Sequence, residues 1–270
     1  MMPANPIHIL ADTLYKFNDK HCIQFASALS YSTLIAVVPM TAFLFFLSLQ
    51  TEMFSGLFDE VRTQLLNQLL PTSREQVETY LLATAKNIKS FSYLGMAFIF
   101  LSAILLSTGV EAALNHIWQV ETQRRVYLRI PGHIILWIVA PLLLLASLSV
   151  STWLISLPYL HDISTQASKF SILLPWFFSS IGLYFLYHYV PNARTKRSHA
   201  IASAMVAALL FELSKWAFTL YVTKYASYEK LYGALSTLPI FMLWIWISWM
   251  VVLLGASLGA TLDEQSRRRH

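Results

Sequence analysis

A carboxylate and an ammonium group lie three residues apart within a long apolar stretch of the chain, at Glu212 and Lys215. On a helix this spacing places the two side chains on adjacent turns, within reach of each other. Charged residues inside such stretches are rare and costly, and they mark either a substrate or ion path or a buried structural pair. We therefore interpret the pair as a candidate polar site, with a structural pair as the alternative.

A second polar stripe precedes this pair in the sequence. Ser107, Glu111 and Asn115 follow one another at four-residue steps in another apolar stretch, and Thr219 follows Lys215 at the same step. A carboxylate on such a stripe must face protein or water, because exposure to lipid would cost about 2–3 kcal/mol or more. We predict that six residues line one polar cavity between helices: Ser107, Glu111, Asn115, Glu212, Lys215 and Thr219.

Local motifs for catalysis are absent from the sequence. The eight histidines are widely scattered, and Cys22 is the only cysteine, so no local metal-binding motif is formed. A phosphate-binding Gly-rich loop and a Gly-x-Ser-x-Gly motif are also absent. We expect no catalytic residues, no metal and no cofactor, and we interpret the chain as a protein other than an enzyme.

The elements that must position these residues are long apolar segments. The chain has 270 residues, 56% of them hydrophobic and 12% charged. Crossing a bilayer takes about 20 predominantly apolar residues in a helix. The sequence predicts an all-α fold, a single integral membrane domain over residues 1–270 with six transmembrane helices, at about 25–49, 93–115, 134–157, 173–190, 200–222 and 238–262.

Lysine and arginine are distributed unevenly between the loops on the two sides of these spans. Eleven lie in the two terminal segments and in the loops after the second and fourth spans, and seven lie in the other loops. Cytoplasmic loops of membrane proteins carry the excess of Lys and Arg, so both termini are predicted in the cytoplasm. Topology and anionic lipids account for the net charge of +5, and we expect no nucleic-acid partner.

Two further helical features are predicted outside the spans. Ile7, Leu10, Leu14 and Phe17 recur at helical spacing, which indicates an N-terminal amphipathic helix that lies on the inner membrane surface or packs under the bundle. The first outer loop carries two apolar stripes separated by a proline and a capping-box pattern, so we predict a helical hairpin at about 54–90.

Three residues are predicted to shape helix packing. Pro39 is expected to kink the first span, since neighbouring Ser and Thr side chains can satisfy the carbonyl groups it frees. Gly255 and Gly259 form a Gly-xxx-Gly motif in the sixth span. This motif permits close helix crossing, either inside the bundle or between subunits.

Several of these segments resemble one known family. Residues 25–31 (Phe-Ala-Ser-Ala-Leu-Ser-Tyr) with Pro39 downstream, and residues 111–118 (Glu-Ala-Ala-Leu-Asn-His-Ile-Trp), are similar to the YihY/BrkB family of bacterial inner-membrane proteins. Pro191-Asn192, Tyr232-Gly233 and the segment from Gly255 fit the same family in order, although its usual Gly-Ala after the fourth loop is replaced by Ala202-Ser203.

The resemblance implies a six-helix protein of the bacterial inner membrane. Members of the family have been labelled a tRNA-processing ribonuclease (ribonuclease BN) and a serum-resistance factor, and links to lipid or lipopolysaccharide export have been suggested. The ribonuclease label fits this chain poorly, because the sequence lacks clustered metal ligands and a soluble catalytic domain.

Three functions follow from these observations, in decreasing order of support. The first is a transporter-like protein that moves a lipid or amphipathic solute through the polar cavity. The second is a non-transporting envelope scaffold that binds lipids or partner proteins, and the third is a tRNA-processing ribonuclease. Membrane lipids are the expected partners, and a homo-oligomer and envelope protein partners are left open.

Overall fold

The computed structural model describes residues 6–50, 93–120, 166–193, 195–224 and 237–268. Within these ranges the chain is helical and contains no strand, in agreement with the predicted all-α fold. The predicted third span (134–157) and the outer hairpin (54–90) lie outside the described residues. The helices are α1 (Pro6–Asp19), α2 (Cys22–Gln50), α5 (Tyr93–Ile117), α8 (Gln166–Tyr189), α9 (Arg197–Lys224) and α11 (Thr237–Arg267).

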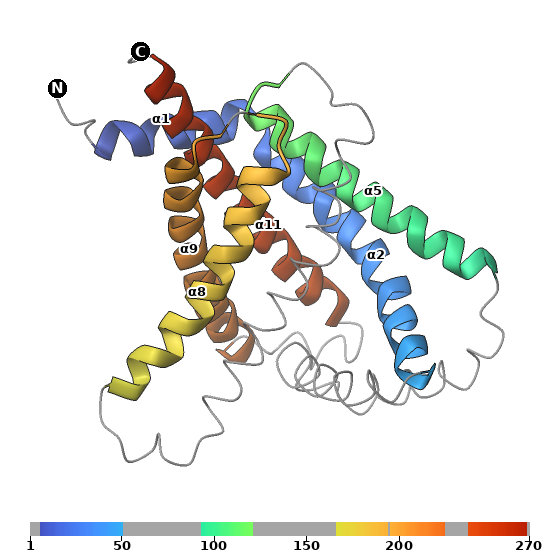
Figure 1. Ribbon diagram of the computed structural model, residues 1–270. Coiled ribbons are helices and arrows are strands. Elements are labelled where there is room, and N and C mark those ends of the chain that lie inside the picture. Colours follow the sequence, from blue (N-terminus) through green and yellow to red (C-terminus); the bar gives the residue numbers. More distant parts are fainter. Residues whose placement is uncertain (1–5, 51–92, 121–165, 194, 225–236, 269–270) are drawn as a thin grey trace.

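Helix α11 is the centre of the described arrangement. It lies between a pair formed by α2 and α5 and a pair formed by α8 and α9, while α1 crosses its C-terminal part (Figure 1). The first turns of α2 and α9 and the last turns of α5, α8 and α11 meet at one end of the bundle (Figure 1). We call this end, where Trp118, Asn192, Lys196 and Asp263 come together, the junction end.

The helices extend beyond the apolar segments that predicted them. Helix α8 begins at Gln166, seven residues before the predicted span, and α11 ends at Arg267, five residues after it. Pro175 lies inside α8, because the residues before the apolar run are also helical. By length and composition, two described helical segments can cross a membrane, Arg197–Val222 and Pro239–Arg267.

The two glycines of the sixth span allow α11 to approach its neighbours closely. A Cβ atom at Gly255 would collide with the Ala207 Cβ and with the Tyr187 hydroxyl, and a Cβ at Gly259 would lie 3.0 Å from the Ser203 Oγ. The motif therefore serves contacts of α11 with α8 and α9 inside the chain, and its predicted use between subunits stays a prediction.

Tryptophan side chains connect α11 to α2. Trp246 Nε1 donates to the Ser27 hydroxyl at 3.1 Å, and Trp249 Nε1 donates to the Thr33 hydroxyl at 3.0 Å. The small polar residues of α2 therefore also act as hydrogen-bond acceptors between helices. Helix α2 continues through Pro39, whose side-chain packing lies outside the described residues, so its predicted role in packing stays a prediction.

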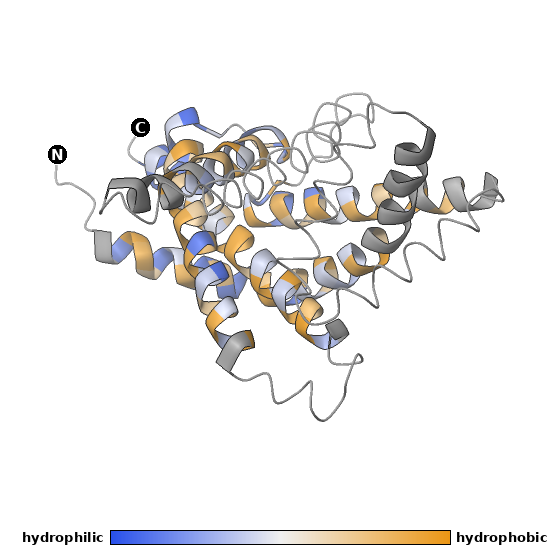
Figure 2. Ribbon diagram, turned by 90° about the horizontal axis from the view of Figure 1, so that it is seen from below, coloured by the Kyte–Doolittle hydropathy of each residue, from blue (hydrophilic) through white to orange (hydrophobic). Residues whose placement is uncertain are grey.

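Helix α1 confirms the amphipathic helix expected at the N-terminus. It carries apolar and polar residues alternately along its length (Figure 2), with Thr13 and Phe17 buried and Leu10 and Leu14 exposed. Phe17 joins the hydrophobic core, so one side of α1 packs on the bundle and part of its apolar surface remains uncovered.

Candidate functional site

Glu212 and Lys215 form the ion pair that their spacing predicts. The Lys215 Nζ lies 2.7 Å from the Glu212 Oε2, and the side chains are 25% and 16% exposed. The Ser179 hydroxyl on α8 donates to the Glu212 Oε1 at 3.3 Å. The carboxylate therefore has partners on both α8 and α9, and the pair remains partly accessible from outside the chain.

An aromatic ring lies beside the ammonium group of this pair and belongs to a small aromatic cluster. The Lys215 Nζ lies 5.7 Å from the centroid of the Phe211 ring, a cation–π distance. The rings of Phe211 and Phe218 lie 5.8 and 5.0 Å from the Trp244 ring of α11. This arrangement lowers the cost of holding a charge in apolar surroundings, because the ring faces carry partial negative charge.

Thr219 and Ser107 both bond to their own helices. The Thr219 hydroxyl donates to the Lys215 carbonyl at 2.9 Å, and the Ser107 hydroxyl donates to the Ile104 carbonyl at 3.1 Å. Thr219 is exposed, whereas Ser107 is buried. These bonds satisfy the two hydroxyl donors within their own helices.

The polar stripe of α5 leads to the junction end. Glu111 is buried, with 6% of its surface exposed, and Asn115 Oδ1 accepts a hydrogen bond from the backbone N–H of Asn192 at 2.6 Å. Asn115 therefore joins the end of α5 to the segment between α8 and α9. Glu111 lies one helical turn, or about 6 Å, further from that end.

The two halves of the predicted cavity lie at different levels of the bundle. Glu212 is fifteen residues along α9 from Arg197, which corresponds to about 22 Å. Glu111 is only about 6 Å from Asn115 at the junction end. Helix α5 packs with α2 and α11, whereas α9 packs with α8 and α11 (Figure 1). A single cavity lined by all six residues stays a prediction.

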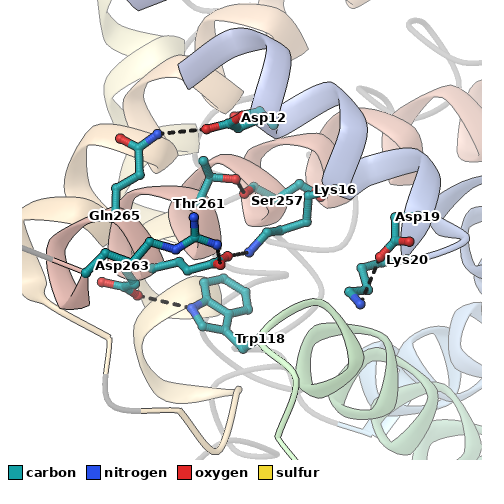
Figure 3. Close-up of polar contacts among 12 residues, drawn as sticks. Asp12, Lys16, Asp19, Lys20, Trp118, Ser257, Thr261, Asp263 and Gln265 are labelled. Carbon is teal, nitrogen blue, oxygen red and sulfur yellow. Dashed lines mark hydrogen bonds and ion pairs between the residues drawn. The ribbon is translucent and has the colours of Figure 1, made fainter. Parts of the chain in front are cut away.

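Sequence reasoning missed Asp263, whose carboxylate accepts three hydrogen bonds in the described part of the chain. Its carboxylate accepts hydrogen bonds from His199 Nδ1 at 2.7 Å and from the Lys196 backbone N–H at 3.2 Å. It also accepts one from Trp118 Nε1 at 3.1 Å (Figure 3). The Asp263 side chain is only 5% exposed. A single buried carboxylate therefore connects the ends of α5, α9 and α11.

Asp263 also completes the first turn of α9. The carbonyl of Lys196 accepts the first helical hydrogen bonds, from the N–H groups of His199 and Ala200, so Lys196 occupies the N-cap position. A lysine side chain cannot cap a helix, and the Asp263 carboxylate takes a capping role from α11. A negative charge at a helix N-terminus is further favoured by the helix dipole.

A second contact at this end attaches α1 to α11. The Lys16 Nζ lies 2.7 Å from the Glu264 Oε2, and Gln265 Nε2 donates to the Asp12 Oδ2 at 3.0 Å (Figure 3). The hydrogen bond from Lys16 lowers the pKa of Glu264 below its ordinary value, with a further contribution from Arg268. Helix α1 is therefore held at a fixed position on α11.

One signal in the sequence points toward Asp263. Glu111, Asn115 and Trp118 lie in one of the segments that carry the family resemblance, and Asp263 lies four residues after Gly259 of the Gly-xxx-Gly motif. The sequence alone does not show that these two segments meet, because the contact spans 145 residues. Within the described ranges no group of three or more His, Cys, Asp and Glu residues is arranged to hold a metal ion.

Comparison with known proteins supplies the family. A family model described as Virulence factor BrkB matches residues 13–270. A UPF0761 membrane protein of Vibrio parahaemolyticus is 35% identical over 246 residues, 89% of this chain and 77% of the relative. UPF0761 membrane proteins of Pseudomonas paraeruginosa and Legionella pneumophila are 38% and 34% identical, over 90% and 94% of this chain.

The chain spans about three fifths of the length of the Pseudomonas and Legionella relatives, 60% and 61%. No solved structure matches the chain. The relatives are named as membrane proteins, which agrees with the long apolar helices α9 and α11. The chain is therefore a membrane protein that belongs to the Virulence factor BrkB (YihY) family.

Proposed function

We propose that this protein is a multi-pass protein of the bacterial inner membrane that moves a lipid or another amphipathic solute between the leaflets. In this proposal six helices span the bilayer, and the junction end lies in the cytoplasm with both termini. The placement of eleven of the nineteen Lys and Arg in the segments at this end supports the orientation.

The observation that carries the proposal is the ion pair of Glu212 and Lys215. In the proposed orientation the pair lies about 22–27 Å along α9 from Arg197 and therefore within a hydrocarbon core about 30 Å thick. Ionised groups at such a depth are costly and typical of transport paths. The partial exposure of both side chains, 16% and 25%, supports access for a polar head group.

The contacts of the pair fit an exchange of partners. Among the described residues the Lys215 Nζ has one carboxylate and one aromatic ring beside it, although an ammonium group has three N–H donors. A phosphate or carboxylate of a passing amphiphile can occupy the remaining donors. The Ser179 hydroxyl on α8 retains the Glu212 carboxylate while this occurs.

The test is lipid movement by the full-length protein in proteoliposomes that contain a fluorescent phospholipid, read by quenching from outside with dithionite. Lys215→Met and Glu212→Gln are each expected to slow movement by tenfold or more, since each strands the other charge in an apolar environment, at a cost of about 3–5 kcal/mol. Ser214→Ala is the matched control, because its hydroxyl bonds only to the Leu210 carbonyl of its own helix.

Two outcomes of the lipid-movement assay contradict the proposal. Movement at the rate of empty liposomes by the wild-type protein rejects transport of the lipid used. Equal movement by wild type, Lys215→Met and Glu212→Gln, with all three inserted and folded, rejects the assigned site. The proposal assigns no catalysis, metal or cofactor to the chain, so nuclease activity that a point change abolishes would also count against it.

A non-transporting scaffold is the second candidate, and the packing of the junction end favours it. The close contacts of Gly255 and Gly259 and the bonds of Asp263 hold several helix ends rigidly together. A scaffold needs such a fixed body to present a surface to lipids or envelope proteins. Its distinguishing expectation is that Lys215→Met leaves envelope-stress phenotypes unchanged while disruption of the junction end reproduces those of a deletion.

A further inference from the structure

Helix α1 leaves a large apolar surface uncovered at the junction end. Leu10, Leu14 and Tyr15 are 62%, 51% and 74% exposed, although Thr13 and Phe17 of the same helix are buried. Leu10 and Leu14 lie one turn apart on one face. Apolar side chains of this size on a helix already attached to the bundle indicate a second surface of contact.

The contacts between α1 and α11 fix the position of this apolar surface along the bundle. Lys16 pairs with Glu264, Gln265 donates to Asp12, and the Cys22 thiol at the start of α2 lies 3.7 Å from the Ser257 hydroxyl. Helix α1 therefore crosses the last turns of α11 and does not run alongside that helix (Figure 1). A helix that crosses the end of a spanning helix can lie in the plane of a membrane surface.

Basic side chains lie at the same end of the bundle as α1. Four exposed residues at the same end carry positive charge: Lys196, Arg197, Arg267 and Arg268. Arg267 and Arg268 follow Gln265 after one intervening serine, so they lie further out along α11 than the residues that hold α1. Apolar side chains followed outward by basic ones match the order of acyl chains and phosphate groups at a bilayer surface.

We propose that α1 and these four basic residues form an interfacial binding surface for anionic phospholipids. Leu10 and Leu14 enter the boundary between acyl chains and head groups, and the basic side chains bind the phosphates. The inference is independent of lipid transport, because it concerns how the junction end contacts the membrane surface and not what passes through the bundle.

The test uses full-length protein in nanodiscs of phosphatidylcholine with or without phosphatidylglycerol, with acyl chains brominated as quenchers. A bimane label is placed at Leu14→Cys and, as the matched control, at Asp19→Cys, about 140° further around the helix. Both variants carry Cys22→Ser, which removes the buried native thiol. We expect strong quenching at position 14 and little at position 19, with phosphatidylglycerol increasing the difference.

The charge contribution is tested by Arg267→Gln together with Arg268→Gln. Each basic residue near an anionic surface contributes about fivefold in affinity, so the double variant should lose most of the increase caused by phosphatidylglycerol. Equally weak quenching at both positions would overturn the proposal that α1 contacts the membrane surface. Crosslinking of position 14 to a second copy of the protein, with weak quenching there, would overturn it as well. Strong quenching at position 14 that is the same with and without phosphatidylglycerol would overturn the assignment to anionic lipid.

Discussion

Replacement of Asp263 is expected to loosen the junction end more than any other single polar change there. The carboxylate accepts from Trp118, Lys196 and His199 and is almost fully buried. Asp263→Ala leaves these donors without their acceptor, and each buried donor left unsatisfied typically costs about 1–3 kcal/mol. Asp263→Asn keeps one carbonyl oxygen but turns an amide N–H toward a donor, so we expect a loss of about 1–3 kcal/mol.

The measurement is unfolding of the purified full-length protein in mixed dodecylmaltoside–SDS micelles, followed by far-UV circular dichroism. Asp12→Asn is the matched control, since Asp12 is exposed and its side chain bonds to Gln265 among the residues that the structure describes. Loss of an exposed polar contact changes stability by about 0.5 kcal/mol or less. The control therefore separates the buried cluster from a general effect of removing charge at this end.

A double-mutant cycle identifies which contact carries the effect. Asp263→Asn and His199→Gln are measured singly and together, and residues in direct contact show coupling of about 0.5–3 kcal/mol. If Asp263→Asn unfolds at the same SDS fraction as wild type and Asp12→Asn, the junction end is not held by Asp263. In that case the assignment of α9 capping to this carboxylate is wrong.

Three further predictions use the same preparation. Gly255→Ala should destabilise the protein by about 1–3 kcal/mol through overpacking, whereas Gly109→Ala, whose added methyl meets only the end of a leucine side chain, should be near neutral. Tyr187→Phe should cost about 1 kcal/mol through loss of its 2.7 Å bond to an α11 carbonyl, and it should lessen the damage of Gly255→Ala because the hydroxyl is one of the colliding atoms; strictly additive losses would refute the packing account. Because the pKa of Glu264 is lowered in the folded protein, its pairing stabilises the fold above the ordinary value of 4.5, and this stability is lost as the pH falls through the lowered pKa. The protection of α1 amides from hydrogen exchange should therefore decrease as the pH falls below 4.5. Lys16→Met should remove most of this pH dependence, and an unchanged profile would contradict the pairing.

Much of the helical architecture could be predicted because apolar length is a local property. The predicted ranges 93–115 and 200–222 fall within α5 and α9. Helix α5 ends two residues later than predicted, and α9 begins three residues earlier and ends two residues later. The start of α8 could not be placed, because Gln166 and the residues after it are polar and carry no hydropathy signal. Hydropathy locates the part of a helix that suits lipid and not the helix itself.

The candidate site was predictable where its contacts are local and unpredictable where they are distant. The pair of Glu212 and Lys215 follows from three-residue spacing, and the structure bears it out. The bond from Ser179 and the three bonds to Asp263 join residues between 33 and 145 positions apart. No periodicity in the sequence indicates any of these contacts. Asp263 itself resembled an ordinary charged residue after the end of a span.

The distribution of contacts along the bundle constrains how any conformational change can proceed. Gly255, Gly259 and Asp263 fix α11 against its neighbours over the last three turns, with tight backbone approach and buried hydrogen bonds. Glu212 and Lys215 lie on the other side of these contacts, about 22 Å or more along α9 from Arg197. Closely packed interfaces resist gradual deformation and change only by discrete rearrangement. If the helices separate to admit a solute to the ion pair, we therefore expect α8 and α9 to move at the end away from the junction, with the Asp263 cluster as the fixed point.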